Sequence, residues 1–141
     1  MFLNVKSEIG RLRKVLLHRP GEELDNLVPN ALDQLLFDDI PWLDLARREH
    51  DAFAEIFRSM GIEVLYLEEL VAETLDENPE IKAQFIKQFL DEGGVYSETL
   101  TDVVTEYLNS FPNTIDMVNK TMAGIRKIDL TSFTKKTLSD Y

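Results

Sequence analysis

Few side chains in this sequence are suited to covalent or acid–base chemistry. The 141 residues contain no cysteine, and therefore no thiol nucleophile, no disulfide and no thiolate metal ligand. Two histidines are present. His18 ends an apolar stretch before Arg19-Pro20-Gly21, and His50 has no catalytic constellation of Asp, Cys or Ser around it. We expect both to be structural, and His50 to be a buried side chain with a hydrogen-bonded ring.

Acidic residues form two groups. Asp38 and Asp39 lie just before a predicted helix, where a carboxylate is stabilised by about 0.3–1 kcal/mol. A second group is typical of a solvated helix surface and comprises Glu68, Glu69, Glu73, Asp76 and Glu77. The sequence has no P-loop, no glycine-rich dinucleotide turn and no metal-ligand cluster. We therefore expect no cofactor and no metal.

Composition and charge limit the classes of partner. Hydrophobic residues make up 44% and charged residues 29%, which is typical of a globular domain. The net charge is −11, so the surface repels nucleic-acid phosphates and anionic lipid headgroups. No apolar stretch approaches the length of a membrane span. We expect a soluble cytoplasmic protein with no nucleic-acid and no membrane partner.

The first half of the chain predicts two strands around one helix. Arg11–His18 and Ile62–Leu67 are strand-like, with Val, Ile, Leu and Tyr at their centres. For the helix between them, we expect Ile40 as the cap, Pro41 at the first helical position and Gly61 after the end. Its apolar stripe consists of Trp42, Ala46, His50, Phe53, Phe57 and Met60. This order predicts a parallel βαβ unit.

The second half predicts three helices. The first begins after Asn78-Pro79 and stops at Gly93-Gly94, and the second runs from Ser97 to Pro112. The third spans 114–123. The tail at 131–141 is polar, and we expect it to fray. Two strands alone do not make a stable sheet, so the predicted sheet has edges without partners.

Five segments occur in a distinctive order and spacing. They are 7–21 (SEIGRLRKVLLHRPG), 35–40 (LLFDDI), 49–53 (EHDAF), 61–65 (GIEVL) and 122–125 (MAGI). Together they resemble the N-terminal third of the arginine deiminases, over most of residues 7–130. A lone HRPG would be weak evidence, whereas the ordered set is specific.

The resemblance implies an α/β fold. It is the fold of a five-bladed α/β propeller, of which this chain would hold the first ββαβ blade, incomplete, followed by a small helical insertion subdomain. We expect the blade at 1–70, the helical insertion at 71–130, and a polar tail or linker at 131–141. The unpaired sheet edges would then meet the other blades.

The resemblance also implies an activity, the hydrolysis of L-arginine to L-citrulline and ammonia. In this family a cysteine thiolate attacks the guanidinium carbon and forms a covalent amidino-thioether. A histidine transfers protons, and carboxylates bind the guanidinium nitrogens. None of these roles maps onto a residue of this chain, so we expect the 141 residues alone to be inactive. The complete enzyme is expected to be a homo-oligomer.

Two residues are candidates for substrate binding through the resemblance. Leu36, in the LLFDD segment, would pack against the aliphatic part of arginine; the alternative is an ordinary core leucine. Asp39 would attract or orient the cationic substrate. Two other interpretations remain open: a non-catalytic helical binding or regulatory module from a truncated gene, and another guanidine-modifying enzyme of the propeller superfamily. The helical insertion favours the deiminase over the latter.

Overall fold

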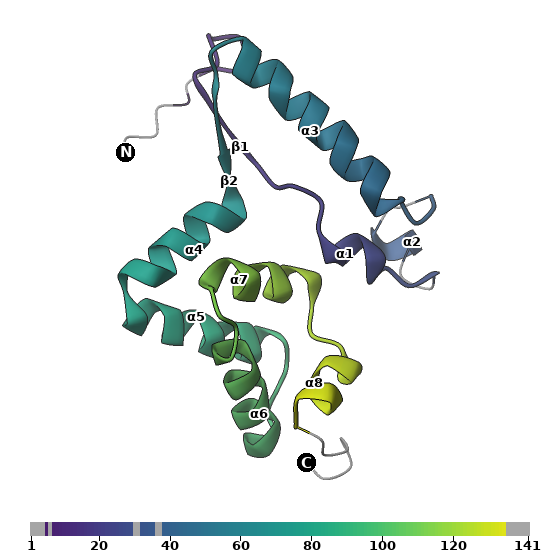
Figure 1. The fold of residues 1–141 in the computed structure, drawn as a ribbon, viewed down its shortest axis with the longest axis vertical. Helices are drawn as coiled ribbons and strands as arrows, with labels where there is room; N and C mark the ends of the chain where they lie inside the picture. The colour runs from purple at the N-terminus through teal and green to yellow at the C-terminus, as the bar shows by residue number, and fades with distance from the viewer. Residues whose placement is uncertain (1–4, 6, 30–31, 36–37, 135–141) are drawn as a thin grey trace.

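The computed structural model describes residues 5, 7–29, 32–35 and 38–134 (Figure 1). Its elements, in chain order, are β1 (Lys14–Leu17), α1 (Glu22–Asp25), α2 (Leu32–Leu35), α3 (Leu43–Ser59), β2 (Glu63–Tyr66), α4 (Leu67–Glu77), α5 (Pro79–Glu92), α6 (Glu98–Asn109), α7 (Thr114–Ala123) and α8 (Lys127–Thr134). We call the elements from β1 to β2 the α/β part and those from α4 to α8 the helical part. In Figure 1 the strands and α3 form the upper region and the helical part lies below.

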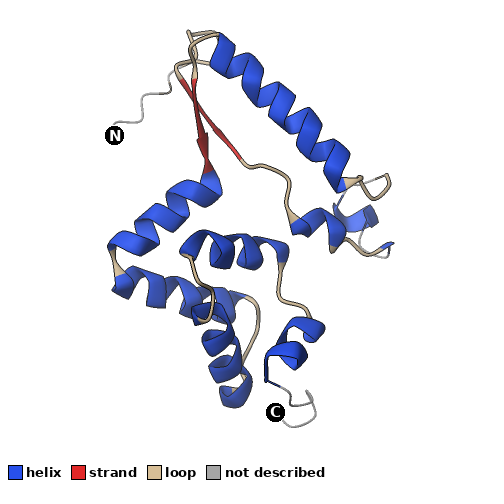
Figure 2. Cartoon of the chain, viewed as in Figure 1, coloured by secondary structure: helices blue, strands red, loops and turns tan. Residues whose placement is uncertain are grey.

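The two strands form the parallel pair that the sequence predicts. Val15 pairs with Val64 and Leu17 with Tyr66, and α3 is the helix that joins the strands. These four residues point to one face, and the ring of Tyr66 lies 5.8 Å from that of His50 on α3. The opposite face carries Leu16, which is 54% exposed. The βαβ unit is therefore confirmed, with α3 on one face of a two-stranded sheet (Figure 2).

The start of α3 differs from the prediction. Trp42, not Ile40, is the N-cap, and Leu43 is the first helical residue. Pro41 fixes φ near −65°, which suits the first turn of a helix and an extended segment equally well. Here Pro41 lies in the extended segment: Trp42 is exposed, and the helix begins at Leu43, which is buried. The end was predicted correctly: Gly61 follows the helix with a φ of +72°.

The buried side of α3 is also rotated from the predicted stripe. Ala54 is fully buried and Leu43 nearly so, although neither belonged to the stripe. Trp42, Phe53 and Met60 did belong to it, and each is at least half exposed. With Leu45 and Ile56 they lie along one side of α3, where the exposed Glu49 interrupts them. Two apolar faces thus exist on α3, and the spacing alone could not show which one meets the sheet.

Several short or terminal helices were not predicted. The four-residue helices α1 and α2 lie between β1 and α3. In the helical part, α4 carries the acidic group that the sequence assigned to a helix surface, and it follows β2 without a loop. The unpredicted α8 covers 127–134, so residues 131–134 of the expected frayed tail are helical. Leu130 is buried, and this tertiary contact stabilises α8 where local sequence does not. The expected boundary at residue 70 falls inside α4, and residues 135–141 lie outside the described part.

The helical part has its own core. The three predicted helices are confirmed as α5, α6 and α7, and the side chain of Asn78 caps α5 by accepting from the backbone N–H groups of Glu80 and Ile81. The buried cluster comprises Ala72, Leu75, Ile86, Leu90, Val103, Val104, Leu108, Met117, Val118 and Leu130. It includes residues from all five helices of this part. The α/β part has no cluster of this size among its described residues.

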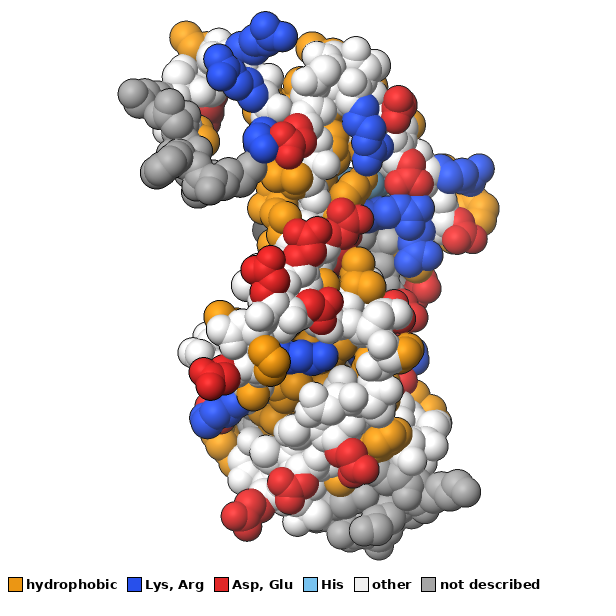
Figure 3. Space-filling view, turned by 60° about the vertical axis from the view of Figure 1, so that its left-hand side comes forward, with side chains coloured by type: hydrophobic (Ala, Val, Ile, Leu, Met, Phe, Trp, Pro, Cys, Tyr) orange, Lys and Arg blue, Asp and Glu red, His pale blue; other side chains and the backbone are white. Residues whose placement is uncertain are grey.

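The surface of the α/β part therefore remains apolar in places. Figure 3 shows apolar side chains at the surface of the upper region, between charged ones. The exposed large apolar residues of this part include Leu16 on β1 and Leu45, Phe53 and Ile56 on α3. Parallel strands are usually covered on both faces, whereas one face of this two-stranded sheet is open among the described residues.

We predict that the chain, studied alone, is helical by circular dichroism but self-associates through the open sheet. Size-exclusion chromatography with light scattering over a concentration series measures this. Leu16→Lys puts a charge on the open face and should reduce association. The control Ile128→Lys places the same charge at a similarly exposed site on α8 and should leave association unchanged. A monodisperse wild-type monomer with a sharp melting transition would contradict the prediction and indicate a complete domain.

Candidate functional site

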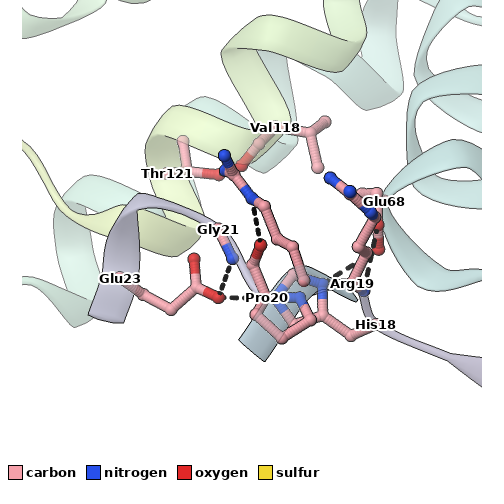
Figure 4. Close-up of polar contacts among 9 residues, drawn as sticks. His18, Arg19, Pro20, Gly21, Glu23, Glu68, Val118 and Thr121 are labelled. Atoms are coloured by element: carbon pink, nitrogen blue, oxygen red, sulfur yellow. Dashed lines mark hydrogen bonds and ion pairs between the residues drawn. The ribbon is translucent and has the colours of Figure 1, made fainter. Parts of the chain in front are cut away.

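The strongest concentration of polar contacts lies where the two parts of the molecule meet (Figure 4). Its centre is His18, one residue beyond the end of β1. The ring nitrogen Nδ1 lies 2.9 Å from Oε2 of Glu68 on α4, and Nε2 lies 3.0 Å from Oε1 of Glu23 on α1. A neutral imidazole has one N–H and can donate to only one carboxylate. The geometry therefore favours the imidazolium, which donates to both.

Glu68 connects this histidine to the helical part. Its side chain is only 9% exposed, and besides His18 it accepts a hydrogen bond from the backbone N–H of Arg19. The sequence indicated a solvated surface for this residue because acidic residues follow it, and that prediction is wrong. Its partners lie 49 and 50 positions away in the chain. Glu69, next to it, is exposed as expected.

Charge and burial shift the pKa values of His18 and Glu23 in opposite directions. Burial lowers the pKa of His18, but the hydrogen bonds and charges of Glu68 and Glu23 outweigh it and raise the pKa above 6.5. Burial raises the pKa of Glu23, but the Gly21 N–H, the backbone N–H of Glu23 itself and His18 outweigh it and lower the pKa below 4.5. The two shifts agree, since each partner favours the charged form of the other.

The residues after His18 are held from a third direction by α3. The Arg19 guanidinium donates two hydrogen bonds to the Asp51 carboxylate, at 2.7 and 2.8 Å. Arg47 donates from Nε to the carbonyl oxygen of Pro20 at 2.9 Å. The turn at 18–21 is thus fixed by side chains from α1, α3 and α4, which explains how a segment without secondary structure keeps one conformation.

A cleft of about 520 Å³ lies beside this turn. Its α/β wall includes Arg19, Glu23 and Arg47, and its helical wall includes Phe111 and Lys120. Most of the charges around it already have partners within the protein: Arg19 pairs with Asp51, and Lys120 pairs with Asp129 at 2.8 Å. The cleft is therefore lined by groups that join the two parts, and it presents no excess of one charge to a ligand.

A second set of contacts ties α1 to the helical part. Lys120, on α7, lies 3.7 Å from Glu22. The side-chain amide of Asn26 donates to the carbonyl oxygen of Ala123 at 2.8 Å and accepts from Arg126 at 3.2 Å. Arg126 and Lys120 both bind Asp129; burial raises the pKa of Asp129, but these bonds outweigh it and lower the pKa to about 2. No local sequence signal marked Asn26.

The two predicted substrate-binding residues are not brought together with this cluster. Leu36 lies outside the described residues. Asp39 is exposed, and its Oδ1 accepts a hydrogen bond from the backbone N–H of Ile40 at 2.7 Å. The side chain of Trp42, the N-cap residue, makes no capping hydrogen bond to α3. Within the part of the chain that the structure describes, the contact of the Asp39 carboxylate is local, and Asp39 is exposed.

The two histidines differ from one another. His18 is structural, as the sequence indicated, with both nitrogens engaged. His50 is partly buried against Tyr66, but its Nε2 is buried and has no hydrogen-bond partner among the residues that the structure describes, so the prediction of a hydrogen-bonded ring is wrong for that atom. Within the described ranges, no three His, Asp or Glu side chains are arranged to hold a metal ion. None of the described helices is both long and apolar enough to cross a membrane.

The fold is an α/β unit that continues directly into a helical unit, and the polar contacts of residues 18–26 hold the two units together. The family model for arginine deiminase matches residues 33–141. Arginine deiminases from three bacteria are similar to the chain: Clostridium perfringens, 57% identical over 98% of the chain; Treponema denticola, 48% over 99%; and Streptococcus pneumoniae, 52% over 91%.

These matches extend over nearly the whole chain, so they reflect more than a short shared motif. The chain belongs to the arginine deiminase family. It spans about a third of the length of the relatives it matches, at 33%, 34% and 31% respectively, and corresponds to their N-terminal part.

We predict that the His18 cluster stabilises the fold over a defined pH range. Because the pKa of His18 is raised, its contribution is fully present below pH 6.5 and is lost as the pH rises through the folded-state pKa. Because the pKa of Glu23 is lowered, its contribution is present above pH 4.5 and is lost on acidification through its folded-state pKa. The contribution of the cluster should therefore be greatest between these two values.

Thermal melts of dilute protein across this pH range measure the effect. His18→Gln should lower the melting temperature most between pH 4.5 and 6.5, and less at higher pH. Glu69→Gln is the matched control on the exposed side of α4 and should keep the wild-type pH profile. An equal loss for His18→Gln at every pH would show that packing, and not charge, accounts for its role.

Proposed function

We propose that this chain is the N-terminal portion of an enzyme that hydrolyses L-arginine to L-citrulline and ammonia. The observation that carries the proposal is the 57% identity to the Clostridium perfringens arginine deiminase over nearly the whole chain. At this level of identity over 138 residues, relatives generally share their fold and the positions of their binding residues. The proposal includes a cytoplasmic location and a homo-oligomeric complete enzyme, both by family resemblance.

The proposed contribution of the chain is structural and substrate-binding. Attack on a guanidinium carbon needs an activated nucleophile, and these 141 residues contain no thiol. The βαβ unit would belong to the first ββαβ blade of a five-bladed propeller, at 1–70. The helical insertion would occupy 71–130, with a tail or linker at 131–141. The exposed apolar face of the sheet supports this proposal, because a neighbouring blade would cover it.

The segment between α1 and α3 is the proposed border of the substrate pocket. Leu36 would contact the aliphatic part of arginine, and Asp39 would attract its guanidinium or amino group. An exposed carboxylate whose hydrogen bond is to the adjacent residue supports the second role, since it links to no distant element among the described residues. Opposite charges within about 4 Å also attract strongly only where water is partly excluded, as in a pocket.

We predict that the chain alone releases no citrulline from arginine, because the nucleophile is missing. Fused to the part of the Clostridium perfringens enzyme that follows the match, it should release citrulline. A colorimetric citrulline assay measures both, with the intact Clostridium enzyme as positive control and a fusion without its cysteines as negative control. Activity of the repurified chain alone would contradict the first expectation. A folded but inactive fusion would contradict the proposed function.

We predict that Asp39→Ala in this fusion weakens arginine use without unfolding the protein. Loss of one charged contact to a cation should lower kcat/KM roughly tenfold, while the melting temperature stays within a few degrees. Steady-state kinetics with parallel melts provide the test, and Asp102→Ala on α6 is the control for removing a carboxylate elsewhere. Unchanged kcat/KM would refute the pocket role, and a large fall in melting temperature would indicate a structural one.

A further inference from the structure

The imidazole of His18 links two helices that are far apart in the sequence. Its Nδ1 lies 2.9 Å from Oε2 of Glu68 on α4, and its Nε2 lies 3.0 Å from Oε1 of Glu23 on α1. In Figure 4 the ring lies between the two carboxylates. Each bond needs a donor from the ring, and the ring has two N–H groups only as the imidazolium. Loss of one proton therefore removes one of the two bonds.

Burial determines which of these bonds is lost. The side chain of Glu68 is 9% exposed, whereas that of Glu23 is 28% exposed. A buried carboxylate that loses its donor costs more free energy than a hydrated one, because water cannot replace the bond. Neutral His18 should therefore keep the proton on Nδ1, bonded to Glu68, and lose the proton on Nε2.

Loss of the Nε2 proton displaces the carboxylate of Glu23. The lone pair of Nε2 then faces Oε1 at 3.0 Å, and the two repel each other. The same Oε1 accepts from the backbone N–H of Gly21 at 2.6 Å, so this bond is weakened when the carboxylate moves. Both bonds fix the start of α1 to the turn after β1. The end of α1 stays attached to the helical part, because the amide of Asn26 donates to the carbonyl oxygen of Ala123 and does not titrate.

His18 is the group in this region that changes charge near neutral pH. Carboxylate, lysine and arginine groups ordinarily titrate outside pH 5–8, whereas histidine titrates within it. Burial lowers the pKa of His18, but the bonds and charges of Glu68 and Glu23 outweigh it and raise the pKa above 6.5. The other charged groups that face the ring or line the cleft beside it are Glu22 of α1, Arg47 and Asp51 of α3, Asp116 and Lys120 of α7, and Arg19 of the turn.

We propose that His18 is a pH-sensitive switch between α1 and α4: its imidazolium links both helices, and the neutral ring, protonated on Nδ1, keeps Glu68 and releases Glu23. The cleft of about 520 Å³ is lined by both carboxylates, so release of Glu23 opens it at the start of α1 as the pH rises. Acidification restores the link. The sheet keeps its attachment to α4 in both states, because the bond to Glu68 persists.

The protonation of the ring nitrogens is the first test. The sequence has two histidines, and His18→Gln and His50→Gln each remove one set of ring signals and so assign the other. Nitrogen NMR spectra are recorded on the 141-residue chain with Leu16→Lys, which limits self-association. We expect both nitrogens of His18 to be protonated at low pH and Nδ1 alone at high pH. A neutral ring with its proton on Nε2 would overturn the proposal, because Glu68 would then be released instead.

Amide hydrogen exchange measures the release of α1. The N–H groups of Leu24 and Asn26 donate to the carbonyl oxygens of Gly21 and Glu22, so they report the opening of this helix. Protection factors remove the direct effect of pH on exchange. At these two amides they should fall roughly fivefold between about pH 6 and pH 9, the scale of one net hydrogen bond, while α6 keeps its protection. Constant protection of α1 over this range would overturn the proposal.

Two variants separate the charge of His18 from a general loosening of the chain. His18→Gln is neutral at every pH, so α1 should lose its pH-dependent step; a step of wild-type size in this variant would overturn the proposal. Glu69→Gln removes a charge on the exposed side of α4 and should keep the step. Its loss there would also overturn the proposal, since the total charge of α4 would then be responsible. These measurements involve no arginine, so their outcome is independent of the proposed function.

Discussion

The buried carboxylate of Glu68 determines how the two parts of this molecule are arranged. It lies in the first turn of α4, which follows β2 without a loop, so the direction of α4 is already coupled to the sheet. By accepting from His18 and from the Arg19 backbone, Glu68 also attaches α4 to the end of β1. An ionised carboxylate at this depth is stable only with such partners. Removing them would leave a buried charge, which costs more than the contacts themselves contribute.

Burial is distributed unevenly between the two parts. The helical part encloses a continuous apolar cluster with Leu108 and Met117 fully buried, whereas the sheet has one covered face and one open face. Hydrophobic burial is the main favourable term in folding, so the helical part should hold most of the stability of the described chain. Polar contacts contribute most to stability where little apolar surface is buried. They are concentrated at residues 18–26, where the α/β part meets the helical part.

Elements with strong local signals were predictable from the sequence. Asn78 before Pro79, Asn113 before a helical stretch, and the glycines after α3 and α7 all act through neighbours within a few positions. The structure gives α7 the predicted bounds and ends α3 before Gly61 as predicted, but α3 begins at Leu43, two residues later than predicted. The parallel strand pair was also predictable, because a strand, a helix and a strand in that order have one common solution.

Features that depend on distant partners were missed for a physical reason. Glu68 has the same local surroundings as the exposed Glu69, and only the position of His18, fifty residues earlier, makes it buried. Asn26 follows an acidic turn and has no cap or motif to mark it; its two partners are about a hundred positions away. The side of α3 that meets the sheet could not be chosen either, since both candidate faces are apolar. Leu36 and the propeller arrangement remain predictions.

The contacts between the two parts and the surface ion pairs of this acidic chain respond differently to salt. With 26 acidic and 15 basic residues, every cation has several possible partners, and most exposed pairs contribute about 0–1 kcal/mol and weaken in salt. The pairs between the two parts differ in burial: Glu68, which binds His18, has a side chain that is 9% exposed, whereas Glu22, which lies 3.7 Å from Lys120, is 62% exposed. Screening acts mainly on charges in water. At physiological ionic strength the surface pairs therefore lose most of their contribution, and the contacts of Glu68 and Asn26 continue to hold the two parts together.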